Sequence, residues 1–325
     1  MIELRKDYIL NRWVIISEGR AKRPKQFHKQ HIVEDDKICY FCPGNEKLTP
    51  KEIGRAEFKN KWIVRWFPNK FPFVKKEGSP KIKNGFLTHG NSYGYHEVIV
   101  ENPDHSKQLA DLSIENIFEV LKVYSLRTDE LSKIKDILYV QIFKNHGAEG
   151  GTSLVHTHTQ VAAYNMIPPL IEEEVNCSIK NKKCLYCDII KKESKSERRI
   201  FETKNFASFA PYSSRFNYEA WIFPKKHLKS ITKMNDDLLK ELAGILKKIL
   251  VKIKEIDASY NYFLHYAPQG KDLHFHIEIT PRIATWAGFE LSTNTIVNSV
   301  SPEYAARFYR AEKKLTRLEP LFSSY

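Results

Sequence analysis

The strongest constraint on the fold of this chain is a set of metal-ligand residues that occurs twice. In each half, a Cys-x-x-Cys pair is followed by a single histidine and then by a His-x-His motif, in the same order and at similar distances. One set could arise by accident, because each motif is short. Two sets in the same order indicate an internal duplication. The first set comprises Cys39, Cys42, His105, His156 and His158, and the second comprises Cys184, Cys187, His227, His274 and His276.

The residues before each single histidine repeat as well. Glu97 begins the run that leads through a proline to His105, and Glu219 begins the run that leads through a proline to His227. In both halves the glutamate precedes the histidine by eight residues. The sequence alignment of the two halves therefore pairs Glu97 with Glu219.

The hydrophobic pattern predicts the same order of elements in both halves. Apolar residues at helical spacing follow each single histidine, then a β-rich run, then a strand that carries His-x-His. The β-rich runs extend from Ile137 to Phe143 and from Tyr260 to His265. We predict an α+β fold in which each half reads strand, strand, helix, strand, strand. The expected helix positions are Ile117, Val120, Leu121 and Tyr124 in the first half and Leu238, Leu239, Leu242, Ile245, Leu246, Ile249 and Ile253 in the second.

The chain has 325 residues, which suggests about two domains. The segment Asn176 to Arg199 is rich in lysine and serine and reads as the junction between the halves. We therefore predict an N-terminal domain over residues 1–175 and a C-terminal domain over residues 176–325.

Composition narrows the class of function. The formal net charge of +13 would attract an anion, but the lysines are spread along the sequence and form no cluster with aromatic residues. Nucleic acid is therefore not expected as a partner, and a zinc-stapled nucleic-acid-binding protein is a weak alternative. No run of 18 or more apolar residues and no signal-peptide core is present, so we expect no membrane association and a cytoplasmic location.

Cysteine usage points to metal binding. In a reducing compartment disulfides are rare, and four of the five cysteines stand as Cys-x-x-Cys pairs, while Cys177 is expected to be an inert thiol. Zinc in structural sites takes four cysteine and histidine ligands. We predict two zinc sites with a structural role. Their ligands are Cys39, Cys42, His105 and His156 in the first half and Cys184, Cys187, His227 and His274 in the second.

The first His-x-His strand carries further chemistry. Alternation along a strand places His156, His158 and Gln160 on one face. If His156 binds zinc, His158 is free to attack the α-phosphorus of a nucleotide as a neutral imidazole. A hydrogen bond from its second ring nitrogen to a backbone carbonyl would fix the reactive tautomer. Gln160 can donate to a phosphoryl oxygen, and the preceding loop, with Gly151, Thr152 and Ser153, suits a phosphate.

With these residues in view, the chain resembles the galactose-1-phosphate uridylyltransferase family of the histidine-triad superfamily. The resemblance runs nearly from end to end. It rests on the following segments: Arg20-Ala21-Lys22-Arg23-Pro24, Phe67-Pro68-Asn69, Asn102-Pro103-Asp104-His105, Gly151-Thr152-Ser153, His156-Thr157-His158-Thr159-Gln160, Pro224-Lys225-Lys226-His227 and Gly288-Phe289-Glu290.

The resemblance implies two tandem histidine-triad-like domains and a ping-pong reaction. A uridylyl group would move from UDP-glucose to His158 and then to galactose 1-phosphate, with Gln160 at the transferred phosphate. The family dimer, which we expect here as a homodimer, builds its active site with residues from both subunits. The residues that the resemblance assigns to the nucleotide sugar are Arg20, Arg23, Asn69, Asn145, Gly151, Thr152 and Ser153.

The chain departs from the family pattern in three places. The bacterial uridylyltransferase motif HPHGQ reads HTHTQ here, which is closer to the ADP-glucose phosphorylases, so adenylyl transfer to phosphate is an alternative, as is histidine-triad nucleotide hydrolysis. The segment after Glu290 lacks the glutamine expected for the hexose phosphate. Some members bind iron, so the second site could instead hold iron or be empty. The aligned iron ligands are Glu174, His265, His274 and His276.

The second half differs from the first at the chemical positions. Glu278 stands where the first half has Gln160, and the loop before His274 lacks the Gly-Gly-Thr-Ser run. A carboxylate at this place would repel a phosphate. We therefore expect catalysis in the first half only, with the second half serving as a scaffold and as the sugar and dimer side of the site.

Overall fold

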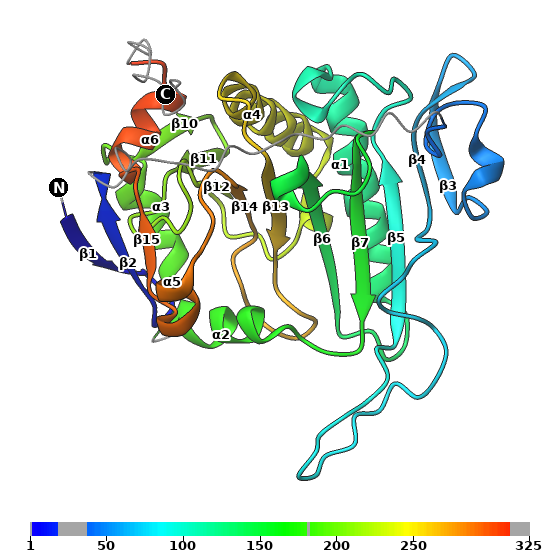
Figure 1. Ribbon diagram of the computed structural model, residues 1–325, viewed down its shortest axis with the longest axis horizontal. Coiled ribbons are helices and arrows are strands. Elements are labelled where there is room, and N and C mark those ends of the chain that lie inside the picture. The colour runs from blue at the N-terminus through cyan, green and yellow to red at the C-terminus, as the bar shows by residue number, and fades with distance from the viewer. Residues whose placement is uncertain (1, 19–37, 181–182, 313–325) are drawn as a thin grey trace.

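The computed structural model describes residues 2–18, 38–180 and 183–312. Its centre is one antiparallel sheet in the order β10-β11-β12-β14-β13-β6-β7-β5-β4-β3 (Figure 1). The first half supplies β3 (Gly54–Phe58), β4 (Lys61–Pro68), β5 (Gly94–Val100), β6 (Tyr139–His146) and β7 (His158–Tyr164). The second half supplies β10 (Arg199–Glu202), β11 (Phe206–Phe209), β12 (Ala220–Pro224), β13 (Tyr260–His265) and β14 (His276–Pro281).

The sheet makes the internal duplication visible. From the outer edge inward, the first half runs β3, β4, β5, β7, β6, and the second half runs β10, β11, β12, β14, β13. The two halves join where β6 and β13 pair antiparallel, with Phe143 opposite Phe263. The predicted order of a helix followed by two strands is confirmed in both halves, but three strands, and not the predicted two, precede each helix in the sheet. Ten strands thus form one continuous sheet across the duplication.

One long helix in each half covers the same face of this sheet. Helix α1 (Ile114–Ser132) begins after Ser113 and α4 (Asp236–Glu255) begins after Asn235, and each of these side chains accepts a backbone N–H of the first turn. Helix α1 packs on β4, β6 and β7, α4 packs on β11 and β12, and the two helices pack on each other. The helix positions predicted from the apolar spacing are buried except for Leu238, which is half-buried in the first turn of α4, and both helices are confirmed.

The opposite face of the first half carries a separate, smaller core. Ile99 and Val161 point toward the helices and belong to the main core, whereas Val98 and Val100 pack with Phe67 on the other side. This division follows the two-residue alternation of a strand. Side chains that share the face of Val98 and Val100 are therefore on the side away from α1.

Smaller elements enclose the second half. A three-stranded sheet in the order β1-β2-β15 joins the N-terminal residues to the C-terminal half, because β2 pairs parallel with β15. The predicted boundary at residue 175 falls within α2, so the division into 1–175 and 176–325 stays a prediction. The bounds are β1 (Ile2–Lys6), β2 (Trp13–Ser17), α2 (Pro169–Ser178), β8 (Ile179–Lys180), β9 (Lys183–Cys184), α3 (Leu185–Glu193), α5 (Gly288–Thr293), β15 (Ile296–Asn298) and α6 (Pro302–Tyr309).

Glu97 and Glu219 are aligned by sequence but do not occupy equivalent positions in the sheet, so this pairing is wrong. Glu97 accepts two hydrogen bonds from Arg127 of α1, both at 2.7 Å, so it faces the helices. Glu219 instead bonds Arg215, whose guanidinium also bonds Glu278. The pairing registers differ by one residue between the halves, and a shift of one residue moves a side chain to the other face. The equal spacing to the following histidine therefore does not place the two glutamates alike.

None of the helices in the described part of the chain has the length and apolar character needed to cross a membrane.

Candidate active site and metal centres

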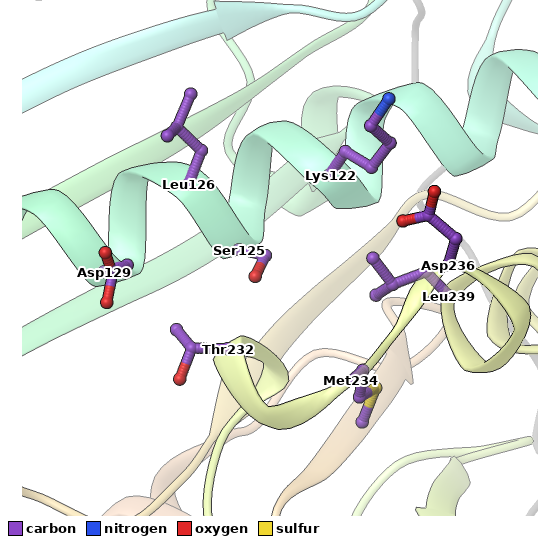
Figure 2. Close-up of a pocket in the computed structure, with 8 residues that line it drawn as sticks. All are labelled: Lys122, Ser125, Leu126, Asp129, Thr232, Met234, Asp236 and Leu239. Atoms are coloured by element: carbon purple, nitrogen blue, oxygen red, sulfur yellow. The ribbon is translucent and has the colours of Figure 1, made fainter.

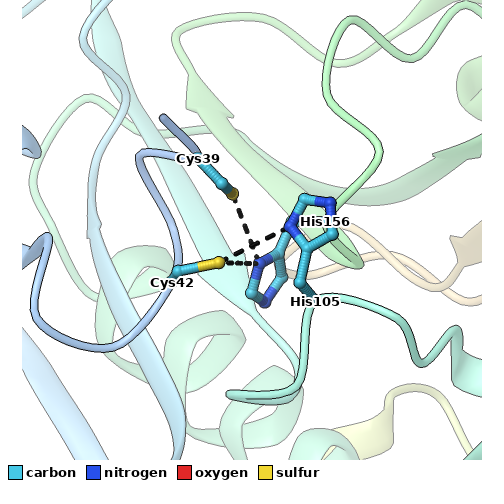
Figure 3. Close-up of side chains that lie close together, drawn as sticks. All are labelled: Cys39, Cys42, His105 and His156. Carbon is cyan, nitrogen blue, oxygen red and sulfur yellow. Dashed lines mark hydrogen bonds between the residues drawn. The ribbon is translucent and has the colours of Figure 1, made fainter. Parts of the chain in front are cut away.

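The four ligands predicted for the first zinc site lie together (Figure 3). His156 Nδ1 is 3.5 Å from Cys39 Sγ and 3.6 Å from Cys42 Sγ, and His105 Nδ1 is 3.5 Å from Cys42 Sγ. Tetrahedral zinc with Zn–S and Zn–N distances of about 2.3 and 2.1 Å has S–N edges of about 3.6 Å. His156 Nε2 donates to the carbonyl oxygen of Asn102 at 2.7 Å, which leaves Nδ1 as the ligand atom. The donor set and its spacing fit zinc.

The second predicted set is also assembled. Cys187 Sγ is 3.6 Å from His227 Nδ1 and 3.5 Å from His274 Nδ1, and Cys184 Sγ is 4.0 Å from His274 Nδ1. His227 Nε2 is 2.8 Å from the carboxylate of Asp272, an arrangement that orients many histidine ligands of zinc. Burial lowers the pKa of His274 to about 3, so the ring is neutral as a metal ligand requires. This set fits zinc as well.

The four residues aligned with the family's iron ligands are not brought together. His274 turns toward Cys184 and Cys187, while Glu174, His265 and His276 lie in a separate buried cluster. Glu278, and not His274, is the fourth member of that cluster. His265 Nδ1 lies 3.0 Å from each carboxylate oxygen of Glu174.

His158 lies at the start of β7 with its reactive nitrogen unblocked. Its Nδ1 is 2.8 Å from the carbonyl oxygen of His156, so Nδ1 carries the proton and Nε2 keeps a lone pair. Burial first, and then the nearby Lys144 ammonium, lower the pKa of His158 to about 4. The ring is therefore neutral at neutral pH. A neutral imidazole with a free Nε2 is competent for nucleophilic attack.

Gln160 shares the face of His158 and is held by a residue that the sequence analysis did not single out. Gln160 Oε1 is 2.9 Å from His96 Nε2, and this is the shorter of two contacts of that nitrogen. The amide nitrogen of Asn69 lies 3.3 Å away and forms no hydrogen bond with Nε2 when Nε2 is protonated. With His96 Nε2 protonated, the Gln160 amide nitrogen is left to donate elsewhere. His96 lies two residues before Val98 on β5, so strand alternation could have placed it on the catalytic face.

The predicted phosphate loop lies between β6 and β7. Gly147 and Gly151 both have positive φ, at 75° and 79°, and a Cβ on Gly147 would collide with Ser259. Thr152 Oγ1 donates to the carbonyl oxygen of Leu154 at 3.0 Å. Ser153 follows in the same loop. The loop therefore packs directly on the second half of the chain.

Asn145 is braced across the two halves. Asn261 of β13 donates its amide to Asn145 Oδ1 at 2.9 Å and to the carbonyl oxygen of Gly150 at 2.6 Å. The amide nitrogen of Asn145 is thereby directed away from Asn261. Arg20 and Arg23, the two other predicted contacts of the nucleotide sugar, lie outside the described residues.

The equivalent place in the second half is filled with aromatic rings. The pairing registers put Trp221 opposite Glu278 where Val98 lies opposite Gln160. The ring of His276 stacks on Phe223 at 4.7 Å and is fully buried. His276 Nδ1 is 2.9 Å from the carbonyl oxygen of His274, as in the first half, so the backbone arrangement is retained while access is lost.

One surface groove lies apart from the predicted site. It has a volume of about 450 Å³ and is open, and none of the predicted site residues lines it (Figure 2). Lys122, Ser125 and Asp129 of α1 form one wall, and Thr232 and Met234 form part of the other. This groove is on the helix side of the sheet, whereas His158 is on the side of Val98 and Val100.

Comparison with known proteins agrees with the fold and the motifs. Residues 2–168 match the family described as galactose-1-phosphate uridyl transferase, N-terminal domain, and residues 89–318 match a domain of unknown function, DUF4921. The ADP-glucose phosphorylase of Arabidopsis thaliana is 33% identical, over 95% of this chain and 92% of its own. The galactose-1-phosphate uridylyltransferase of Thermotoga maritima is 31% identical, over 95% of this chain and 98% of its own.

Solved structures give the same result. The crystal structure of the Arabidopsis thaliana ADP-glucose phosphorylase with bound ADP-glucose matches with a TM-score of 0.83 at 32% identity, over 97% of this chain and 100% of that one. A uridylyltransferase structure matches with a TM-score of 0.75 at 28% identity, over 96% and 98%. The duplicated histidine-triad fold and these relatives define an enzyme that transfers nucleotidyl groups. The chain belongs to the galactose-1-phosphate uridyl transferase family.

Proposed function

We propose that His158 is the nucleophile of a two-step nucleotidyl transfer. In the first step Nε2 attacks the α-phosphorus of a nucleotide sugar, an N–P bond forms, and the bond to the sugar phosphate breaks. In the second step an acceptor phosphate attacks the same phosphorus and frees the histidine. The observation that carries this proposal is the Nδ1 hydrogen bond to the carbonyl oxygen of His156, which presents a neutral Nε2.

The surrounding residues have roles that fit this step. The amide nitrogen of Gln160 donates to a non-bridging phosphoryl oxygen as charge develops there. Asn145 and the loop of Gly151, Thr152 and Ser153 hold the rest of the nucleotide sugar, as do Asn69, Arg20 and Arg23. The bracing of Asn145 by Asn261 and of Gln160 by His96 supports these assignments, because both amides are held in one orientation.

The substrates that we propose are UDP-glucose as donor and galactose 1-phosphate as acceptor. The names of several relatives, galactose-1-phosphate uridylyltransferases, support uridylyl transfer and this acceptor. A second candidate is transfer of an adenylyl group from ADP-glucose to phosphate. It is favoured by the HTHTQ motif and by the similarity to an ADP-glucose phosphorylase solved with ADP-glucose. Both reactions use the same intermediate at His158 and differ in the base and in the acceptor.

Each Cys2His2 cluster is proposed to hold one zinc ion in a structural role. In the first half, the ligand His156 is also the residue whose carbonyl oxygen orients His158. A fixed His156 therefore holds the tautomer of His158. In the second half, where Trp221 and Phe223 cover His276, we propose a scaffold without catalysis.

A homodimer is proposed from an exposed apolar segment. Between β4 and β5 the chain extends away from the sheet as a long excursion (Figure 1). On it, Phe71 is 83% exposed, Phe86 104% and Leu87 77%. Large apolar side chains in one segment are typical of an interface with another chain. We also propose a cytoplasmic location, because four of the five cysteines lie in the metal-type clusters and none is in a disulfide.

The test is to trap the intermediate. The protein is incubated with UDP-glucose or ADP-glucose, quenched in alkali because an N–P bond is acid-labile, and measured by intact mass spectrometry. We expect a uridylyl or adenylyl adduct that His158→Gln abolishes and His276→Gln retains. Addition of galactose 1-phosphate, phosphate or buffer to the adduct then identifies the acceptor. An adduct that survives in His158→Gln would contradict the mechanism.

A further inference from the structure

A polar network is buried behind the strand that carries His158, on the helix side of the sheet. The carboxylate of Glu101 accepts hydrogen bonds from Lys144 Nζ, Thr157 Oγ1 and Thr159 Oγ1, each at 2.5 Å, and from Tyr124 OH at 3.0 Å. Glu101 and Lys144 are fully buried. A buried ion pair loses the hydration of both charges, so such a pair is weak evidence for stability by itself.

The network reaches the nucleophile through the backbone. Lys144 Nζ has three hydrogen-bond acceptors, namely Glu101, Thr157 Oγ1 at 3.0 Å and the carbonyl oxygen of His158 at 3.0 Å. An ammonium group has three protons, so all of them are used. The Lys144 side chain therefore fixes the peptide that follows His158.

The strands separate at this place. Strand β6 pairs with β7 only as far as Phe143 opposite Gln160, within the described residues, while β6 continues along β13 to His146. In the second half, β13 and β14 stay paired up to His265 opposite His276. The pair in the first half that would correspond to His265 and His276 is Asn145 and His158.

The separation leaves a backbone acceptor that Lys144 satisfies. The backbone N–H of Glu101 donates to the carbonyl oxygen of Thr157, so alternation turns the carbonyl of the next residue, His158, toward β6. Because β6 no longer pairs with β7 at this point, the carbonyl oxygen of His158 has no backbone N–H of β6 to accept from. A buried carbonyl oxygen without a hydrogen bond lowers the stability of the fold. The Lys144 ammonium takes the place of the missing strand.

The second half of the chain has apolar residues at the positions that form the polar network in the first half. By the pairing registers, the positions of Lys144, Thr157 and Thr159 are occupied there by Leu264, Phe275 and Ile277, all of which are fully buried. The same backbone thus packs with apolar residues where the ladder stays closed. The polar network occurs in the half in which β6 and β7 open beside His158.

We propose that the Glu101–Lys144 ion pair is a positioning device for the nucleophile. It spans the gap between β6 and β7 and fixes the His158 backbone, while the side chains of His158 and Gln160 lie on the other face. This inference rests on the proposed role of His158. A displacement of about 1 Å in a reacting group lowers rates by about 100-fold.

The test is a charge-free double variant, Glu101→Gln with Lys144→Met, because a single substitution would leave one buried charge unpaired. The matched control is Glu97→Gln with Arg127→Met, which removes another buried ion pair between β5 and α1. With saturating UDP-glucose or ADP-glucose, we expect nucleotidyl-adduct formation to slow by about 10- to 100-fold in the first variant only. The half-saturating concentration should stay within about threefold of the wild type, because substrate contacts are unchanged.

A second measurement needs no substrate. The ¹⁵N spectrum of histidine-labelled protein reports the ring of His158, which is assigned by its loss in His158→Gln. We expect its ring resonances to move or broaden in Glu101→Gln/Lys144→Met and to stay in place in the control. An unchanged ring spectrum, or equal adduct rates in the two double variants, would overturn the positioning role. Failure of the wild type to form an adduct would contradict the proposed function alone, and the ring spectrum would still decide this inference.

Discussion

At the scale of single residues, the proposed mechanism depends on which side-chain atoms of His158 and Gln160 remain without a hydrogen bond inside the described part of the chain. The Nδ1–H group of His158 donates a hydrogen bond to a backbone carbonyl oxygen, and Gln160 Oε1 accepts a hydrogen bond from His96 Nε2. Each is left with one functional atom for a ligand, the lone pair of Nε2 and the amide N–H group. If both ring nitrogens of His158, or both the oxygen and the nitrogen of the Gln160 amide, formed hydrogen bonds inside the protein, neither residue could contact a phosphoryl group.

Gln160→Glu converts this position to the residue that the second half carries. The carboxylate would face the phosphoryl oxygens, and like charges disfavour the transition state. We expect nucleotidyl-adduct formation to fall by about 100- to 1000-fold, the range seen when a donor to a developing oxyanion is lost. The measurement is the burst of sugar 1-phosphate on mixing with donor. Gln160→Met removes the donor without adding charge, so we expect a smaller loss of adduct formation than in Gln160→Glu. Equal rates in the wild type and both variants would refute the role of Gln160 at the phosphate.

At the scale of elements, the two metal clusters tie loops to strands. In each half the Cys-x-x-Cys segment and the single histidine meet the first histidine of His-x-His just before its strand begins. His156 and His274 precede β7 and β14 and do not belong to them. The proposed metal ligands would therefore fix the entry to the strand, and only the first of these strands carries the proposed nucleophile, His158.

Removing one cysteine from each cluster should separate structure from catalysis. We expect Cys42→Ser and Cys187→Ser each to lose about one zinc per chain, because thiolate ligands contribute much of the affinity. Adduct formation should fall by about 10-fold or more in Cys42→Ser, where His156 also orients His158, and should persist in Cys187→Ser. Metal analysis after dialysis and the adduct assay measure both effects. The exposed Cys177→Ser is the control, and loss of zinc from it would argue against the assigned ligands.

The second cluster can also be tested by replacing a residue that contacts a ligand and is not itself one. Asp272→Ala removes the carboxylate that lies 2.8 Å from His227 Nε2 but leaves all four ligands in place. We expect zinc affinity at this site to fall by about 10- to 100-fold. Competition with a chelator measures the change, and Asp188→Ala, on the surface of α3, should leave the affinity unaltered.

At the scale of the whole molecule, the duplicated halves are fused into one sheet. Asn261 of the second half braces Asn145 of the first, and the N-terminal strand β2 pairs with β15 near the other end of the chain. The second half thus supports the site in the first half although its own histidine is covered. The excursion between β4 and β5 extends away from the sheet and carries the exposed apolar side chains Phe71, Phe86 and Leu87.

Phe86→Glu should convert the proposed dimer to a monomer. A charge at a fully exposed apolar side chain costs little in the free chain but opposes burial against a second copy. Light scattering is expected to give twice the chain mass for the wild type and the mass of one chain for the variant. Leu291→Glu on α5, also exposed, is the matched control and should stay dimeric. A monomeric wild type would contradict the prediction.

Much of this protein could be predicted from its sequence, because the informative signals are local. The period of the apolar residues gave α1 and α4, and strand alternation put His158 and Gln160 on one face. Similarly, Cys-x-x-Cys with distant histidines identified two Cys2His2 clusters, since few other arrangements use those residues. The aligned iron ligands failed because one histidine, His274, had two possible partners, and only its direction in space selects the cysteines.

The tertiary structure decided what depends on pairing between distant strands. Nothing local shows that β6 leaves β7 beside His158, that Lys144 fills the gap, or that Glu97 and Glu219 face opposite sides of the sheet. A pairing register is a relation between two segments, and a shift of one residue reverses every side chain. The sequence by itself was enough to predict the two long helices, the strands around them, the metal ligands and the nucleophile. The sheet decided which of two similar histidines is accessible, because Trp221 and Phe223 cover one of them.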